Sequence, residues 1–230
     1  MDKWRQIWKK RKIQADIAAL ETLIRVDGFD TGSGKITEKE WLRYVKFIFG
    51  KMGISKRDSI FEIGCGSGAF LYPLYKMGHR VGGIDYSGSL IRMANKKMDA
   101  MDFSVCEARH LQTRKKYDIV IANSVFHYFP DLEYARDVVN RMIEKSVKAT
   151  AFLDLPDSDF EIESEREREA NHDVSEGEYK MKYVGLSHLY FKRKWFSDLL
   201  EKYNFRVDIF DQNIKQYGNS KFRFNVLVKK

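Results

Sequence analysis

The stretch that decides the fold of this chain is Ser59-Ile60-Phe61-Glu62-Ile63-Gly64-Cys65-Gly66-Ser67-Gly68. A short apolar run leads into a turn rich in glycine, and residues 69–77 after the turn predict a helix that Gly78 ends. Glycine adopts backbone angles that other residues avoid, and it lets a ligand approach the main chain. Because a helix N-terminus directs free N–H groups at such a turn, the stretch predicts a strand, a ligand-binding turn and a helix.

Dinucleotides are one class of cofactor that binds such a turn. Gly64, Gly66 and Ala69 satisfy the pattern G-x-G-x-x-G/A. Asp85 follows ~20 residues later, where that pattern places an acidic residue on the ribose. The turn alone does not decide which cofactor the chain binds.

The same stretch resembles motif I of the class I S-adenosylmethionine-dependent methyltransferases, which reads acidic-x-Gly-x-Gly-x-Gly. Glu62, Gly64, Gly66 and Gly68 match it position by position. An acidic residue before the turn favours a cofactor with a cationic amino group over one with a pyrophosphate. The resemblance implies S-adenosylmethionine as the cofactor.

The segment after the predicted strand 117–122 is similar to the corresponding region of small-molecule methyltransferases. It reads Asn123-Ser124-Val125-Phe126-His127-Tyr128-Phe129-Pro130-Asp131. Methyltransferases that act on exocyclic base amines typically carry Asn/Asp-Pro-Pro-aromatic here, whereas residues 123–126 contain no proline. Loops at the carboxyl ends of parallel strands carry the site in open α/β sheets, so we expect Asn123 and His127 at the cleft.

Hydrophobic periodicity adds the remaining elements of the fold. The segments that predict strands are 59–63, 80–84, 103–106, 117–122, 148–154, 205–211 and 221–229. The resemblance implies an α/β fold: a Rossmann-like seven-stranded, mostly parallel sheet with an antiparallel C-terminal strand, helices on both faces and an N-terminal helical cap. We expect one methyltransferase domain over 1–230, made of a cap (1–56), a cofactor-binding core (57–155), an insertion (156–187) and a C-terminal helix with antiparallel strands (188–230).

The residues before the first strand predict two helices. Apolar residues recur at helical spacing through 3–26, and Asp27-Gly28 ends that helix. Thr37 and Glu40 form a capping box for the second helix. The family often adds N-terminal helices that close over the cofactor, and we expect the same of this pair.

The resemblance assigns contacts along the cofactor. The glycines of motif I hold its methionine half, and Asp85 accepts two hydrogen bonds from the ribose diol. Glu107, followed by Ala108, meets the adenine amino group; the alternative is an acid on a loop that faces solvent. The expected cofactor-binding residues are Glu62, Gly64, Cys65, Gly66, Gly68, Asp85, Tyr86, Glu107, Ala108 and Asn123.

His127 is the candidate catalytic residue. An imidazole with an ordinary pKa of ~6.5 can accept a proton near neutral pH, which a hydroxyl acceptor requires and a neutral amine does not. The alternative is that His127 only lines the site or orients a neighbour. Tyr128, His188 and Tyr190 are the expected substrate contacts, in a pocket between the loop after 117–122, the insertion and the segment 188–190.

Composition limits the compartment and the partners. The net charge is +8, and residues 157–178 hold ten acidic residues against two arginines, a local −8, so the remainder carries +8 − (−8) = +16. A basic body suits an anionic small-molecule acceptor, although a solvated lysine-rich surface is the simpler explanation. The two cysteines make no disulfide framework and have no zinc spacing, so we expect a cytoplasmic protein without metal or membrane span.

The acceptor class stays open at this point. A small molecule such as a sugar or secondary metabolite, methylated on oxygen or nitrogen, is the first interpretation. RNA or protein methylation is an alternative, with nucleic acid disfavoured by the proline-free segment after 117–122. A non-catalytic cofactor-binding module is a third, and either a monomer or a homodimer is consistent with the sequence.

Overall fold

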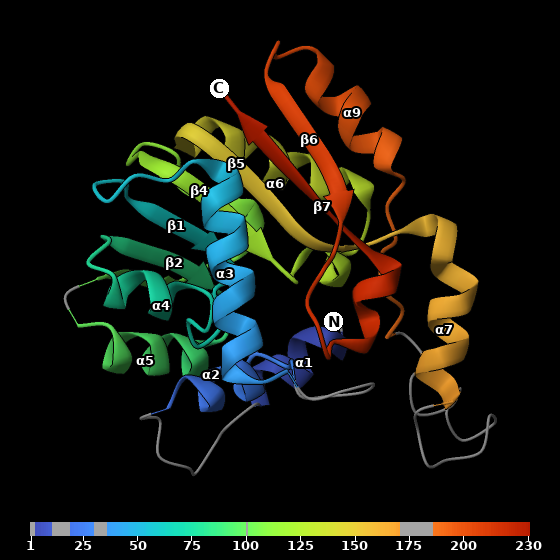
Figure 1. The fold of residues 1–230 in the computed structure, drawn as a ribbon, viewed down its shortest axis with the longest axis horizontal. Coiled ribbons are helices and arrows are strands. Elements are labelled where there is room, and N and C mark those ends of the chain that lie inside the picture. Colours follow the sequence, from blue (N-terminus) through green and yellow to red (C-terminus); the bar gives the residue numbers. More distant parts are fainter. Residues whose placement is uncertain (1–2, 11–18, 30–35, 100, 171–185) are drawn as a thin grey trace.

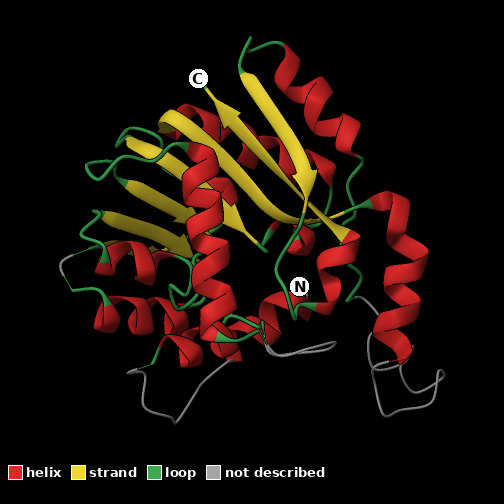
Figure 2. Ribbon diagram, viewed as in Figure 1, coloured by secondary structure: helices red, strands yellow, loops and turns green. Residues whose placement is uncertain are grey.

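The computed structural model describes residues 3–10, 19–29, 36–99, 101–170 and 186–230 (Figure 1). Within them, seven strands form one sheet between layers of helices (Figure 2). The strands are β1 (Ile60–Ile63), β2 (Val81–Asp85), β3 (Asp102–Val105), β4 (Tyr117–Asn123), β5 (Ser146–Pro156), β6 (Arg206–Asp211) and β7 (Arg223–Lys229). Their order across the sheet is β3-β2-β1-β4-β5-β7-β6.

The sheet is parallel from β3 to β5, and β7 runs antiparallel to both β5 and β6. β1 lies inside the sheet, where Ile60 pairs with Val81 of β2 and with Ile119 of β4. The chain winds outward from β1 to β3 and then returns to β4 on the other side. The carboxyl ends of β1 and β4 therefore form the switch point at which open α/β sheets bind ligands. The expected Rossmann-like fold is confirmed.

Helices cover both faces of the sheet. One hydrophobic cluster joins the sheet to α3, α4 and α5, and a second joins it to α6 and α9. The helices are α1 (Lys3–Lys10), α2 (Leu20–Val26), α3 (Glu38–Met52), α4 (Leu71–Lys76), α5 (Gly88–Lys97), α6 (Leu132–Lys145), α7 (Glu161–Ala170) and α9 (Arg193–Glu201). α7 belongs to the predicted insertion, and none of its residues is buried.

The predicted helix over 3–26 is wrong as one continuous element. Residues 11–18 lie outside the described residues, but Ala19 has extended backbone angles and α2 begins after it. α1 contacts α5, whereas α2 contacts α3, so the two segments pack on different helices. The predicted N-cap of the second helix is confirmed: Thr37 precedes α3, and its hydroxyl accepts a hydrogen bond from Glu40 N at 3.3 Å.

Candidate active site

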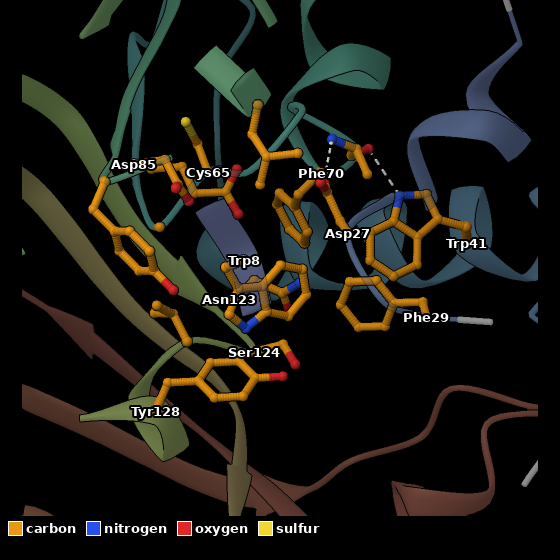
Figure 3. Close-up of a pocket in the computed structure, with 16 residues that line it drawn as sticks. Trp8, Asp27, Phe29, Trp41, Cys65, Phe70, Asp85, Asn123, Ser124 and Tyr128 are labelled. Carbon is orange, nitrogen blue, oxygen red and sulfur yellow. Dashed lines mark hydrogen bonds between the residues drawn. The ribbon is translucent and has the colours of Figure 1, made fainter. Parts of the chain in front are cut away.

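A pocket lies at the carboxyl ends of β1, β2 and β4, beneath the N-terminal helices (Figure 3). Side chains from the cap and from the sheet share its walls. The lining residues are Trp8, Asp27, Phe29, Trp41, Glu62, Gly64, Cys65, Ala69, Phe70, Asp85, Tyr86, Leu90, Asn123, Ser124, Val125 and Tyr128. Its free interior measures about 50 Å³, well below the roughly 300–1,000 Å³ of an ordinary ligand pocket.

The turn after β1 requires glycine for two reasons. Gly64, Gly66 and Gly68 have φ of 66°, 54° and 91°, in the left-handed region that side chains disfavour. A Cβ on Gly64 would also lie 2.4 Å from Val125 Cγ2, and one on Gly66 would lie 2.4 Å from the Asp27 carboxylate. The turn is therefore held in one shape by neighbours on both sides.

Asp85 ends β2 and fixes the same turn from the sheet side. Its carboxylate accepts hydrogen bonds from Gly66 N at 3.1 Å and from Ser87 N at 2.7 Å. Burial raises the pKa of Asp85 to about 6, against the effect of these two bonds. Asp85 also lines the pocket, where an acceptor oxygen can meet a ribose hydroxyl.

Asp27 fixes the turn from the cap side, although it was not predicted from the sequence as a site residue. Its carboxylate accepts a hydrogen bond from Ser67 N at 2.7 Å. It also accepts one from Ala69 N at 3.1 Å (Figure 3). Burial raises the pKa of Asp27 to about 7, although the backbone bonds oppose this. The Asp27-Gly28 pair indicated only a helix end, so no local signal distinguished it.

Glu62 brings a third carboxylate to the pocket, from β1. The side chain is 2% exposed, and its Oε2 has no hydrogen-bond partner. Burial raises the pKa of Glu62 well above its usual value, and the nearby charges of Asp27 and Asp85 add to the rise. No lysine, arginine or histidine is among the described residues that line this pocket. A cationic group would compensate all three carboxylates, so these residues fit a ligand with an ammonium and a sulfonium.

α1 contributes Trp8 to the pocket lining and contacts several segments around the pocket. The Ser87 hydroxyl donates to the Trp8 carbonyl at 3.2 Å, and Trp4 Nε1 donates to the Ser187 carbonyl at 3.0 Å. The rings of Trp4 and Trp8 meet Tyr128 edge-on at 4.9 Å and 5.5 Å. Arg5 pairs with Glu107, one of the expected adenine contacts.

A buried polar network supports the pocket floor. Asn123 accepts a hydrogen bond from the Tyr44 hydroxyl at 3.0 Å, and Ser124 donates to Asp154 at 2.7 Å. Ser124 directly follows β4, and Asp154 lies within the neighbouring strand β5, where the pairing with β7 is irregular; their φ angles are 55° and 58°. Such backbone angles cost energy in residues other than glycine and gather at functional sites. Tyr44 and Asp154 were not predicted as site residues, because their hydrogen-bond partners are distant in the chain.

His127 lies next to the pocket rather than in its lining. It is 3% exposed, its Nδ1 is 3.3 Å from Arg223 Nη1, and its ring centroid is 4.7 Å from that of His188. Burial lowers the pKa of His127 well below its usual value, and the charge of Arg223 lowers it further. Burial likewise lowers the pKa of His188. Both imidazoles are therefore neutral near pH 7.

The segments of the predicted acceptor site do lie together. Leu189 N donates to the His127 carbonyl at 2.9 Å, and the Tyr190 hydroxyl is 3.4 Å from Ser164 Oγ in α7. Trp4 stacks on His188 with ring centroids 5.1 Å apart. The part of the insertion over 171–185 lies outside the described residues.

The predicted site residues fall into two groups. Those that line the pocket are Glu62, Gly64, Cys65, Asp85, Tyr86, Asn123 and Tyr128. Those outside its lining are Gly66, Gly68, Glu107, Ala108, His127, His188 and Tyr190. The main additions from the structure are Trp8, Asp27, Phe29 and Trp41, which all come from the cap.

Two further predictions concern absences. Within the residues that the structure describes, no group of three or more histidine, cysteine or acidic side chains is arranged to hold a metal ion. Among those same residues, no helix has both the length and the apolar character that a membrane crossing needs.

Residues 61–149 match a family model described as a methyltransferase domain. The ubiquinone biosynthesis O-methyltransferase of Pelagibacter ubique (strain HTCC1062) is 25% identical over 95 residues, which are 40% of this chain and 40% of that protein. The nonribosomal peptide synthetase dtxS1 of Metarhizium robertsii (strain ARSEF 23 / ATCC MYA-3075) is 30% identical over 106 residues, 42% of this chain and 1% of the synthetase. The matches thus span less than half the length of these curated relatives.

Solved structures resemble the whole chain at low sequence identity. Magnesium protoporphyrin IX methyltransferase (ChlM) from Synechocystis PCC 6803 with bound SAM has a TM-score of 0.56 and 15% identity, covering 98% of this chain and 89% of that one. The plantazolicin methyltransferase BpumL, in complex with a pentazolic desmethylPZN analog and SAH, has a TM-score of 0.62 and 14% identity, covering 100% of both chains. At these identities the likeness shows the fold.

Proposed function

The chain belongs to the class I S-adenosylmethionine-dependent methyltransferases, and from this premise we propose that it methylates an oxygen or nitrogen atom of a small molecule. The observation that carries the proposal is the pocket at the switch point of the sheet. Its glycine turn, the ribose-binding position of Asp85 and the unpartnered Glu62 oxygen suit S-adenosylmethionine. A nicotinamide dinucleotide would bring a pyrophosphate to the same carboxylates, which repel it.

The chain's own residues hold and shield the cofactor. Gly64 and Gly66 give its methionine half access to the main chain, and Asp85 accepts hydrogen bonds from the ribose. S-adenosylmethionine supplies a methyl group activated by its sulfonium charge. Trp8, Tyr128 and the other aromatic side chains of the pocket exclude water. Orientation of the acceptor in such a site can supply about 7–11 kcal/mol of the barrier reduction.

The acceptor meets the methyl group near the loop after β4. Tyr128 and Ser124 line the cofactor pocket on that side, and His127, His188 and Tyr190 adjoin it. Aromatic rings with a few polar groups are the usual lining of a small-molecule site. Names among the relatives support this class, since ubiquinone biosynthesis and plantazolicin methyltransferases are among them.

His127 serves in this proposal as an orienting residue. The guanidinium of Arg223 always donates, so Nδ1 of His127 is the acceptor in their contact. The neutral imidazole then carries its proton on Nε2 and offers no lone pair there. His127→Gln should lower kcat only a few-fold, whereas loss of a general base costs on the order of 10²–10⁴-fold. A loss of kcat on the order of 10²–10⁴-fold would instead indicate that His127 acts as the general base.

Calorimetry with S-adenosylmethionine, S-adenosylhomocysteine and NAD tests the cofactor. Binding of the first two, with NAD weaker or absent, is expected; tighter NAD binding would overturn the proposal. Transfer of radiolabelled methyl to a panel of phenols, sugars and amines then tests the acceptor class. Label transferred only to RNA or protein would contradict a small-molecule acceptor.

A further inference from the structure

The pocket places three carboxylates from three elements around one small cavity; those of Glu62 and Asp85 are buried, and that of Asp27 is half-buried. Asp27 comes from the end of α2, Glu62 from β1 and Asp85 from the end of β2. Glu62 Oε2 is buried without a partner, and no basic side chain is among the described residues of the lining. Buried anions without a compensating cation are costly, so this arrangement favours a cationic ligand.

The two forms of the cofactor differ in charge. S-adenosylmethionine has an ammonium, a carboxylate and a sulfonium, and so carries one net positive charge. S-adenosylhomocysteine has lost the sulfonium charge and is neutral overall. A site that senses this difference would hold the substrate form and release the product form.

Resting on the proposed function, we propose that Asp27 is the residue by which the cap distinguishes the sulfonium cofactor from its demethylated product. Asp85 and Asp27 each accept two backbone N–H groups. In the proposed function Asp85 binds the ribose, which both forms of the cofactor share. Only Asp27 comes from the cap, and its bonds to Ser67 N and Ala69 N join the cap to the glycine turn. Its negative charge reaches the pocket only while α2 packs against that turn. A cationic cofactor therefore stabilises the closed cap, and loss of the charge after methyl transfer weakens closure.

The first test compares dissociation constants. Calorimetry is performed on the whole chain with S-adenosylmethionine, S-adenosylhomocysteine and sinefungin, in which a protonated amine replaces the sulfonium. Asp27→Asn should reduce the preference for the two cationic ligands over S-adenosylhomocysteine by roughly three- to tenfold. Ser67→Ala is the matched control, because it removes the 3.4 Å hydroxyl contact with the Leu23 carbonyl at the same junction without changing charge. It should leave the preference unchanged.

The second test measures protons released on binding. The titratable groups that face Asp27 are Glu62 on β1, Cys65 in the turn, and Asp85 and Tyr86 at the end of β2, with Tyr128 after β4. Burial raises the pKa of Asp27 to about 7, so a cation that lowers this pKa releases protons near pH 7. Titrations in two buffers of different ionisation enthalpy should show more release with S-adenosylmethionine than with S-adenosylhomocysteine. Asp27→Asn should reduce that difference.

The outcomes separate this proposal from the proposed function. An unchanged preference and unchanged proton release in folded Asp27→Asn would overturn the role of Asp27 and leave it a structural link. Failure of the unaltered chain to bind either cofactor form would overturn the proposed function itself.

Discussion

Gly66 shows at the residue scale how the turn, the cap and the cofactor site depend on one another. Gly66→Ala introduces a Cβ 2.4 Å from the Asp27 carboxylate and places it at φ 54°. We expect Asp27 to be displaced and affinity for S-adenosylmethionine to fall at least tenfold by calorimetry, with a backbone cost of about 1–2 kcal/mol. Gly53→Ala is the control, because Gly53 has φ 67° but nothing within 4 Å of its Cβ position. Equal effects of the two variants on binding would contradict this account.

The second prediction at this scale concerns Asp85, which accepts a hydrogen bond from the glycine turn. Asp85→Ala removes the acceptor for the ribose and for Gly66 N, so we expect cofactor binding to weaken by about 1.5–3 kcal/mol. Asp102→Ala is a suitable control, since Asp102 lies on β3 outside the pocket lining and its carboxylate pairs with Lys115. Unchanged affinity in folded Asp85→Ala would show that the ribose lies elsewhere.

At the element scale, α1 and α2 form the part of the site that must move. The pocket has only about 50 Å³ free, and Trp8 and Asp27 from these helices occupy its walls. A cofactor of several hundred cubic ångströms therefore requires the cap to shift and close again. We expect hydrogen exchange in 3–10 and 20–26 to slow when S-adenosylmethionine is added, while α9 is unaffected. Equal exchange in both states would argue against a moving cap.

At the scale of the whole molecule, the buried carboxylates make stability depend on pH. Burial raises the pKa of Asp27 to about 7 and of Asp85 to about 6, so the native state binds more protons than the unfolded chain between pH ~4 and 7. Stability from these groups is present at low pH and falls as pH rises through that range. Between pH 5 and pH 8, the free energy of unfolding measured in urea should fall less for Asp27→Asn than for the unaltered chain. The difference should be on the order of 2–4 kcal/mol. Comparing the two proteins cancels the opposite contribution of His127 and His188, whose pKa values burial lowers. An equal fall in the free energy of unfolding for both proteins would show that the pKa of Asp27 is not raised by folding.

The sequence by itself determined the sheet, the glycine turn and the position of Asp85, because strand periodicity and turn chemistry act between residues close in the chain. Only the tertiary structure decided which distant groups complete the site. Asp27 meets the turn forty residues later, and Arg223 reaches His127 from the antiparallel strand β7. Neither contact has a local pattern, since each depends on how whole elements pack around the sheet. Burial then decides the chemistry, because loss of hydration raises the pKa of Glu62 and lowers the pKa of His127. The extent of burial depends on the packed fold and cannot be seen in a sequence motif.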